Sequence, residues 1–432
     1  MSPYHEDACR VLLQRYGNRG LYGDVVRLYT AFSARLNDEL GIAPEEETQQ
    51  LYRSVMKLRD FHLNNQDLKI AGPDHENIKE EIVSQYRRFM NGQADCHCVV
   101  KGGMGAGTSQ VMAAALHSMK QGEHTLLRVK FEVMNSGIPC YAIGKILDLL
   151  SAAGAVPAAE PRYCDFETLL LYHMSRIEKI TARLRGRRQR IVLLVENLEA
   201  MDPHSMDLFL THLLGKCGEK LMLIGAYCTN LGPDRNTLST LELMGGISVL
   251  TLPPLDSQAT ISYLSHRVPR MPEPPDLRGI WQHTGGVLML LENVVQNIRA
   301  DAPSLYDLTG ETAKQLSILR SSMSAEEWHC LQVISVFRHG VELERLTCVT
   351  GKNTLELISI VERLRQRELV SEEQFDSHLL ARVHPEMLRE AIYHGLSRLQ
   401  RTELHRVAAR LYEEQEERNR RDYFSLRELH DH

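Results

Sequence analysis

The chain has 432 residues, 43% of them hydrophobic, and its 50 basic and 56 acidic residues give a formal net charge of −6. This length predicts roughly two to four domains, and the mildly acidic balance provides no general attraction to nucleic acid. Nine scattered cysteines, no apolar run of about 18 residues and no signal-peptide pattern together favour a cytoplasmic protein without a membrane span.

The N-terminal residues 5–52 predict a helix, a turn, a second helix, a loop and the start of a third helix. Apolar residues recur at helical spacing on one face of the second helix: Val25, Leu28, Phe32 and Leu36. A single helical repeat cannot bury its own apolar face, so the rest of the chain or a partner must cover this one. We assign residues 1–56 to a partial helical-repeat domain and the polar residues 57–80 to a linker.

From residue 96 onward, short apolar runs alternate with helical patterns. The runs are Cys96–Lys101, Thr125–Phe131, Ile191–Glu196, Leu221–Tyr227 and Ile247–Leu252. This alternation predicts an α/β domain with a five-stranded parallel sheet, which we place at residues 81–255. The apolar residues 191–195 are consecutive, which is typical of a central strand that is covered on both faces.

The first predicted strand leads into a glycine-rich segment at residues 102–109. A phosphate-binding loop has the pattern G-x-x-x-x-G-K-[ST], and here Gly102 and Gly107 match its glycines while Ser109 matches its metal-binding hydroxyl. In such a loop, backbone N–H groups and a helix N-terminus hold the phosphates, and the lysine neutralises them. Thr108 stands in place of the lysine. A glycine-rich turn without a ligand remains the alternative, since such patterns often occur by chance.

The third predicted strand ends in Glu196, where P-loop ATPases carry an acid that holds Mg²⁺. The next position commonly carries a second acid that polarises the attacking water, but Asn197 cannot accept a proton. The alternative is that both are simply polar residues at a strand end. The candidate nucleotide-binding residues are Gly102, Gly105, Gly107, Thr108, Ser109, Glu196 and Asn197. Ser109 and Glu196 are the candidate Mg²⁺ ligands if nucleotide binds, and we assign no catalytic residue.

After Pro253-Pro254 the pattern is helical to the end of the chain. We assign residues 256–314 to a helical lid, 315–376 to a winged-helix-like domain and 377–432 to a helical segment. A capping-box pattern, Ser324-Ala325-Glu326-Glu327, is expected to begin a helix inside the second of these parts.

Part of the N-terminal segment resembles the bacterial transcriptional activator domain. The resemblance is carried by Tyr29–Leu36, Glu39–Pro44, Glu47-Thr48 and Leu51-Tyr52. It implies that residues 5–55 correspond to the C-terminal half of that domain, so that the chain starts inside it.

Residues 75–410 resemble the signal-transduction ATPases with numerous domains, which occur in large bacterial transcriptional regulators. The matching pieces are the loop 102–109, Leu193–Ser205, Ile224–Tyr227, Leu252–Leu255, Thr284–Gly286, Val383–Tyr393, Arg401 and Leu404-His405. The resemblance implies a P-loop NTPase core flanked by all-α modules. It also implies ATP or ADP with Mg²⁺ as the ligand.

The departures from this family all fall at nucleotide positions. The loop lysine is Thr108, the paired acids are Glu196-Asn197, the fourth-strand arginine is Cys228, and Gly285-Gly286-Val287 lacks the family's proline. The apolar framework persists, which is typical of a fold kept after its nucleotide chemistry has weakened. We therefore expect nucleotide binding to be weak or lost, and we do not expect an enzyme.

Three functions follow from these patterns. The first is a bacterial transcription-regulatory protein with a degenerate ATPase scaffold, acting through contacts with protein partners such as a DNA-binding subunit or a missing N-terminal domain. The second is a genuine ATP-binding switch controlling a transcriptional activator. The third, specific DNA binding through residues 315–376, is disfavoured because Arg363, Arg365 and Arg367 are interspersed with Glu356 and Glu362.

Overall fold

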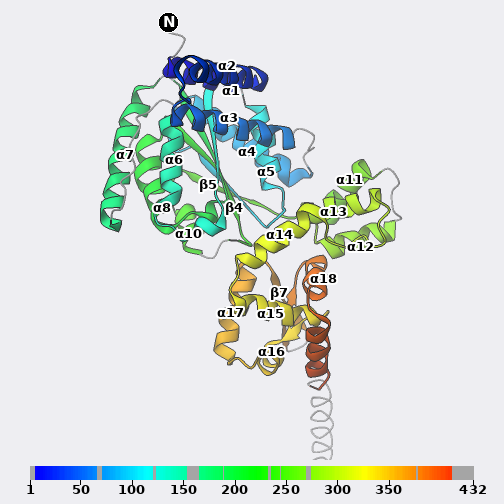
Figure 1. Ribbon diagram of the computed structural model, residues 1–432. Coiled ribbons are helices and arrows are strands. Elements are labelled where there is room, and N and C mark those ends of the chain that lie inside the picture. The colour runs from blue at the N-terminus through cyan, green and yellow to red at the C-terminus, as the bar shows by residue number, and fades with distance from the viewer. Residues whose placement is uncertain are drawn as a thin grey trace, which may run out of the picture. The chain divides into compact units, whose positions relative to one another are not determined.

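The computed structural model describes residues 5–65, 71–119, 123–152, 165–187, 189–231, 235–243, 245–268, 274–375 and 378–410. The chain forms two compact units, one made of residues 1–102 and 106–253 and the other of residues 103–105 and 254–432 (Figure 1). None of the helices within these described ranges is long and apolar enough to cross a membrane.

The first unit begins with three helices, as the sequence predicts. They are α1 (Glu6–Asn18), α2 (Tyr22–Leu40) and α3 (Glu46–Asn65). Helix α2 ends at Gly41, whose φ of +66° suits the glycine that commonly closes a helix. The three helices share one buried cluster: Cys9, Leu13, Val25, Phe32, Leu36, Leu51 and Val55. The apolar face predicted to need a cover is therefore buried within the chain, by α1 and α3.

The linker expected at residues 57–80 is mostly helical. Helix α3 continues to Asn65, and α4 (Pro73–Met90) begins before residue 80. Although this stretch is polar overall, Leu58 and Ile78 are buried at 4% and 8% exposure. A few apolar residues at the right spacing are enough to hold both helices against the core.

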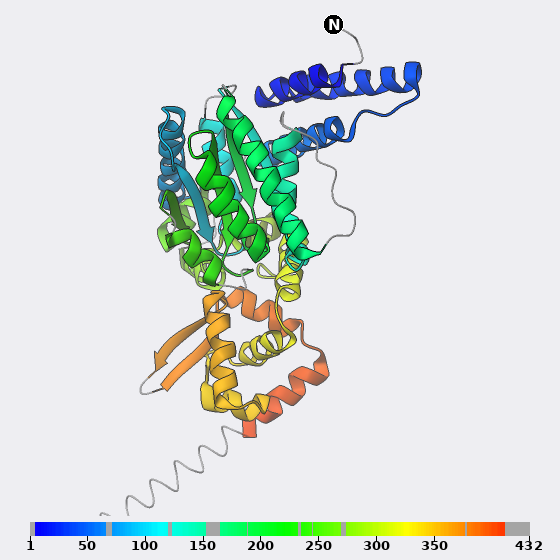
Figure 2. The same cartoon turned by 90° about the vertical axis from the view of Figure 1, so that its left-hand side faces the viewer.

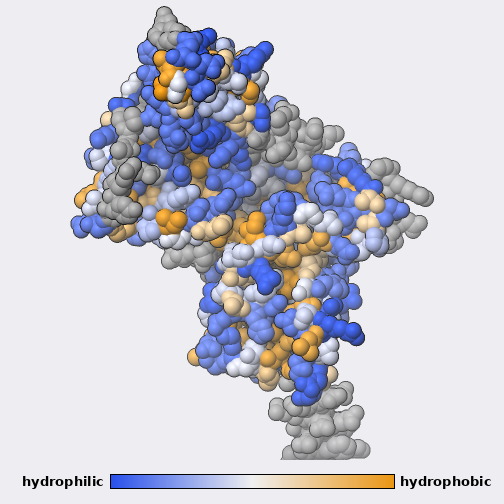
Figure 3. Space-filling model, in the orientation of Figure 1, coloured by the Kyte–Doolittle hydropathy of each residue, from blue (hydrophilic) through white to orange (hydrophobic). Residues whose placement is uncertain are grey.

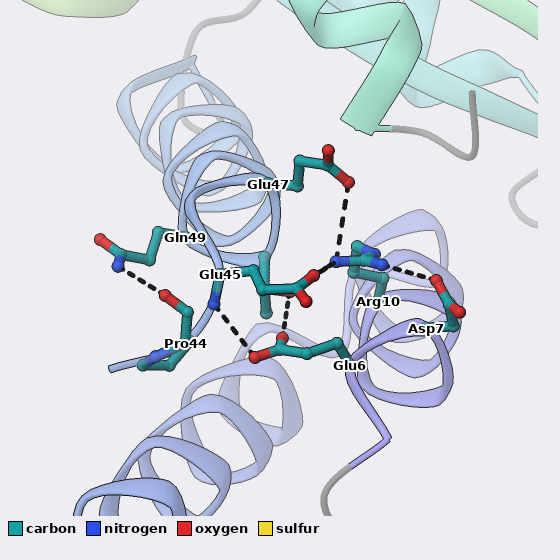
Figure 4. A network of polar contacts seen from close by, with 8 residues as sticks. Glu6, Asp7, Arg10, Pro44, Glu45, Glu47 and Gln49 are labelled. Carbon is teal, nitrogen blue, oxygen red and sulfur yellow. Dashed lines mark hydrogen bonds and ion pairs between the residues drawn. The ribbon is translucent and has the colours of Figure 1, made fainter. Parts of the chain in front are cut away.

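A polar network fastens α1 to the start of α3 (Figure 4). Arg10 lies between Asp7 at 2.5 Å and Glu45 at 2.8 Å. The Glu6 carboxylate accepts a 3.0 Å hydrogen bond from the Glu45 N–H and a second one from the Thr48 hydroxyl. Thr48 is fully buried, so this network contributes more than isolated surface ion pairs do.

The centre of the first unit is a parallel sheet of five strands in the order β2-β3-β4-β1-β5. The strands are β1 (His97–Gly102), β2 (His124–Lys130), β3 (Arg190–Glu196), β4 (Leu221–Cys228) and β5 (Ile247–Leu252). Each predicted strand is present and differs from the prediction by no more than one residue at either end. The predicted five-stranded parallel α/β core is thus confirmed.

Helices cover both faces of this sheet (Figures 1 and 2). Leu193 on β3 belongs to the apolar cluster that includes residues of α6 (Tyr141–Ala152) and α7 (Phe166–Gly186). Leu194 belongs to the opposite cluster, with residues of α4 and α5 (Thr108–Ser118). Successive side chains of a strand point to opposite faces, so two covered faces require consecutive apolar residues. The remaining elements of this unit are η1 (Val133–Asn135), η2 (Leu198–Ala200), α8 (Pro203–Asp207), the π-helix η3 (Leu208–Leu214), α9 (Gly215–Cys217) and α10 (Arg235–Leu243).

The second unit begins with helices and continues into a mixed module. The helices are α11 (Ser257–Arg267), α12 (Pro274–Thr284), α13 (Leu288–Arg299) and α14 (Gly310–Ser321). The module comprises α15 (Ala325–Val336), β6 (Val341–Glu342), α16 (Leu343–Thr350), α17 (Thr354–Gln366), β7 (Val370–Phe375) and β8 (His378–Val383), followed by α18 (Glu386–His394). The capping box formed by Ser324 and Glu327 is present as predicted.

Strands β6, β8 and β7 form an antiparallel sheet in that order, beside the helices α15 to α17. Strand β8 begins after the predicted boundary at residue 376, so the antiparallel sheet extends into the segment that was predicted to be helical. Residues 398–410 are helical, and the part of the predicted segment 377–432 that follows residue 410 lies outside the described residues.

Candidate nucleotide-binding site

The glycine-rich loop lies where β1 ends and α5 begins. Gly105 and Gly107 have φ angles of +77° and +102°, which a residue with a side chain adopts only with strain. The N–H groups of Gln110 and Val111 both donate to the Gly107 carbonyl at 3.0 Å. The first amides of α5 have no acceptor within the helix, so this end of α5 is suited to receive an anion.

Two neighbours hold the loop close to the sheet. A Cβ on Gly102 would lie 3.1 Å from the Thr108 methyl carbon, so the threonine side chain packs over this glycine. On α4, the His75 Nε2 lies 3.0 Å from the Ala106 carbonyl oxygen. Because a carbonyl oxygen only accepts, the His75 Nε2 donates this bond, and burial lowers the pKa of the ring. The sequence offered no signal for His75, because the contact joins residues 31 positions apart.

The structure brings the two predicted metal-binding residues together. Ser109 donates a 3.4 Å hydrogen bond to Oε2 of Glu196. The other carboxylate oxygen, Oε1, accepts a 2.5 Å hydrogen bond from Nε of Arg128 on β2. Arg128 also donates from Nη1 to the Lys57 carbonyl on α3, at 3.0 Å. The Glu196 side chain is only 5% exposed and that of Arg128 16%, so this is a largely buried ion pair.

Sequence analysis missed Arg128, although the strand register explains its position. Lys130 on β2 is in register with Glu196 on β3, so their side chains share a face of the sheet. Arg128 precedes Lys130 by two residues and therefore points to that same face. Strand order alone would have identified the pair, but strand order is not visible in a single sequence.

Asn197, at the position where a second acid is common, has a structural role. Asn197 adopts a left-handed φ of +59°, a conformation that asparagine tolerates better than most residues. Its Nδ2 donates a 2.9 Å hydrogen bond to the Phe131 carbonyl, just beyond β2. An aspartate here could not donate this bond, so the amide of Asn197 ties the ends of two neighbouring strands together.

Beside this edge lies a buried carboxyl group that the sequence analysis did not single out. Glu199 in η2 is 5% exposed, and its Oε2 accepts a 2.9 Å hydrogen bond from the Cys228 N–H at the end of β4. Its Oε1 is buried and has no hydrogen-bond partner among the residues that the structure describes. Burial raises the pKa of Glu199 to about 7, although the Cys228 N–H favours the ionised form.

In the second unit, the segment Gly285-Gly286-Val287 has its own backbone requirement. The Val287 N–H donates to the Thr284 carbonyl at 3.1 Å, and a proline could not make this bond. A Cβ on Gly286 would lie 1.9 Å from the Leu255 carbonyl oxygen, so only glycine fits there.

Strand order, loop and strand-end acid together define a P-loop NTPase fold. The glycine loop follows β1, the acid Glu196 ends β3, and β4 lies between these two strands. This is the arrangement in which P-loop ATPases hold a nucleotide between the loop and the acid.

Comparison with known proteins adds a family match at one end of the chain. Residues 1–56 match the family described as bacterial transcriptional activator domain. The assignment of this match to the C-terminal half of that domain stays a prediction. No curated protein matches the sequence.

Three solved structures are among those that match this chain. One is a signal-transduction ATPase with numerous domains and a tetratricopeptide repeat sensor from Pyrococcus horikoshii (14% identity, 73% of this chain and 42% of that chain, TM-score 0.32). The second is the ORC2 protein of Aeropyrum pernix (12% identity, 80% of this chain and 96% of that chain, TM-score 0.47). The third is a RuvB variant of Thermotoga maritima (14% identity, 71% of this chain and 91% of that chain, TM-score 0.34). This chain spans less than half of the length of the first.

The raised pKa of Glu199 predicts a specific pH dependence of stability. Its folded-state pKa of about 7 exceeds the ordinary value of 4.5, so the folded state binds the proton more tightly. The stabilisation is complete below pH 4.5 and is lost as the pH rises through 7. Relative to the wild type, Glu199→Gln should therefore gain about 3 kcal/mol of unfolding free energy between pH 4.5 and about pH 8. Urea unfolding of both proteins at several pH values measures this difference. If the free energies of unfolding of the two proteins change with pH in the same way, the prediction is contradicted.

Proposed function

We propose that this chain is a bacterial transcription-regulatory protein that acts through protein–protein contacts and does not hydrolyse ATP. The observation that carries the proposal is the state of Glu196, whose two carboxylate oxygens are bonded to Arg128 and Ser109. The match of residues 1–56 to a transcriptional activator domain supports the regulatory part.

ATP hydrolysis on this fold needs a cation at the β- and γ-phosphates, a metal ion and a group that orients the attacking water. Thr108 supplies no charge at the lysine position. Glu196 is already neutralised by Arg128, and the Asn197 amide is used in its bond to Phe131. Each requirement is compromised by a different residue, so no single reversion is expected to restore turnover.

Purified full-length protein is accordingly expected to show no ATP hydrolysis above the buffer background. A coupled phosphate-release assay with Mg²⁺ measures this, with Ser109→Ala as the control that separates turnover at this site from contamination. Turnover of about 1 s⁻¹, a low value for an enzyme, that disappears in Ser109→Ala would refute the proposal.

A nucleotide-binding switch is the second candidate, and the geometry of the loop favours it. Gly105 and Gly107 keep the left-handed backbone of a phosphate-binding turn, and α5 begins directly after it. The loop fits phosphate groups, which the amides of Thr108 and Ser109 would bind. In this second candidate, protein partners would distinguish the nucleotide-bound chain from the nucleotide-free chain, and no hydrolysis would be needed.

Restoring the loop lysine tests this second candidate. Thr108→Lys should tighten ATP binding by about 10- to 150-fold, because a charge-assisted contact contributes roughly 1.5–3 kcal/mol. Isothermal titration measures the affinities, with Thr108→Met as a control of similar length without charge. If lysine, methionine and threonine give the same affinity, the loop does not accept phosphate.

The winged-helix-like module supports protein contacts over DNA recognition. Helix α17, the candidate recognition helix, carries Arg363 and Arg365, and Arg367 follows its last residue. All three arginines are engaged within the second unit. Arg363 donates to Glu327 at 2.7 Å, Arg365 pairs with Glu362 at 3.3 Å, and Arg367 donates to the Ser322 carbonyl at 3.1 Å. On the one face of the molecule that Figure 3 shows, hydrophobic and hydrophilic residues are interspersed.

The chain alone is expected to select no DNA sequence. A gel shift over a random DNA library should give only weak binding that salt abolishes. Replacing both Glu356 and Glu362 by lysine makes α17 basic, and this variant should gain salt-sensitive binding, which shows that the assay detects it. Enrichment of a defined site by the wild-type chain would overturn the expectation.

A further inference from the structure

We propose that Arg128 is the resident cation of the nucleotide site and keeps divalent metal ions away from Glu196 and Ser109. Phosphate groups then bind the loop without Mg²⁺, and the ligand is a nucleoside diphosphate or triphosphate free of metal. The nucleotide part of this inference rests on the nucleotide binding proposed above, whereas the exclusion of metal stands on the ion pair itself.

The Mg²⁺ ion that the fold implies does not fit the donor set as it stands. Mg²⁺ needs near-ideal octahedral geometry with oxygen ligands at about 2.0–2.1 Å. Both oxygens of Glu196 already accept hydrogen bonds, from Arg128 Nε and from the Ser109 hydroxyl. A metal ion on Oε1 would stand beside the guanidinium, where two positive charges repel strongly at low solvent exposure.

Arg128 is also held from its far side. Its Nη1 donates to the Lys57 carbonyl on α3, so displacing the guanidinium breaks a second bond, to the N-terminal helical segment. A guanidinium does not lose its proton in proteins, so the positive charge is permanent. Lys130, in register with Glu196, adds a further positive charge on the same strand.

A guanidinium is chemically able to take over the metal's role toward phosphate. Its planar donors bind phosphate oxygens directly, which a metal ion otherwise bridges. Arg128 and Ser109 share one carboxylate, and Ser109 is the second residue of α5, at the end of the loop. A phosphate at the loop therefore meets a cation supplied by the chain.

Binding of Mn²⁺ to the full-length protein, followed by electron paramagnetic resonance, tests the exclusion of metal without nucleotide. The wild type should bind no Mn²⁺ at this site. Arg128→Gln should bind about one equivalent through the released carboxylate and Ser109. Adding Glu196→Gln to that variant should abolish the binding. Mn²⁺ binding by the wild type that Glu196→Gln removes would overturn the proposal, and so would an Arg128→Gln protein that is folded and binds none.

Arg190→Gln is the matched control. Arg190 donates to the Met90 carbonyl at 3.0 Å, a bond like that of Arg128 to Lys57, but it lies at the opposite end of the strands. This variant should bind no Mn²⁺. If Arg128→Gln does not fold, Arg128→Lys replaces it. The lysine ammonium keeps the positive charge but forms fewer bonds to Glu196 than the guanidinium does. The Arg128→Lys protein should therefore bind Mn²⁺ weakly, where the wild type binds none. Mn²⁺ binding equal to that of the wild type would count against the proposal.

Nucleotide titrations form the second arm. ADP affinity of the wild type should agree within about twofold between Mg²⁺ and EDTA, whereas a change of about tenfold or more would contradict metal-free binding. Absence of any nucleotide binding would remove the nucleotide switch and the metal-free ligand together. The Mn²⁺ titration would then still decide whether Arg128 excludes metal, so the two failures are distinguishable.

Discussion

A carboxylate at the end of a fully covered strand must have partners, since a buried charge without them is very costly. Glu196 is in this position, because it ends β3, which is covered on both faces, and its side chain is only 5% exposed. Where P-loop ATPases satisfy such an acid with a metal ion, here Arg128 and Ser109 satisfy it. The acid is thus satisfied within the chain, and this ion pair links the sheet, the loop and the N-terminal helices.

The same ion pair joins the transcriptional-activator-like segment to the nucleotide-binding fold. Helix α3 completes the buried cluster of the N-terminal helices and also supplies the Lys57 carbonyl that holds Arg128. Of the two covers that the sequence left open for this segment, the rest of the chain or a partner, the structure shows the chain itself. Any partner of this segment must use surfaces other than the face of Val25, Phe32 and Leu36.

The sequence predicted those features that depend on neighbouring residues. Consecutive apolar residues identified β3, and glycine spacing identified the loop, because both signals are local. Features that depend on contacts across the fold were not predictable. Arg128 becomes meaningful only when β2 is known to neighbour β3, and His75 only when α4 is known to lie beside the loop. The sequence shows an asparagine at residue 197, where an acid is common. Its hydrogen bond to the Phe131 carbonyl is seen only in the structure.

Crystals grown with ADP and Mn²⁺ would test the central claim most directly, since the anomalous signal of manganese locates the ion without interpretation of the surrounding density. The account predicts no anomalous peak between Ser109 and Glu196, with the Arg128 guanidinium still bonded to the carboxylate. A manganese peak coordinated by both Ser109 and Glu196, with Arg128 turned away, would contradict it.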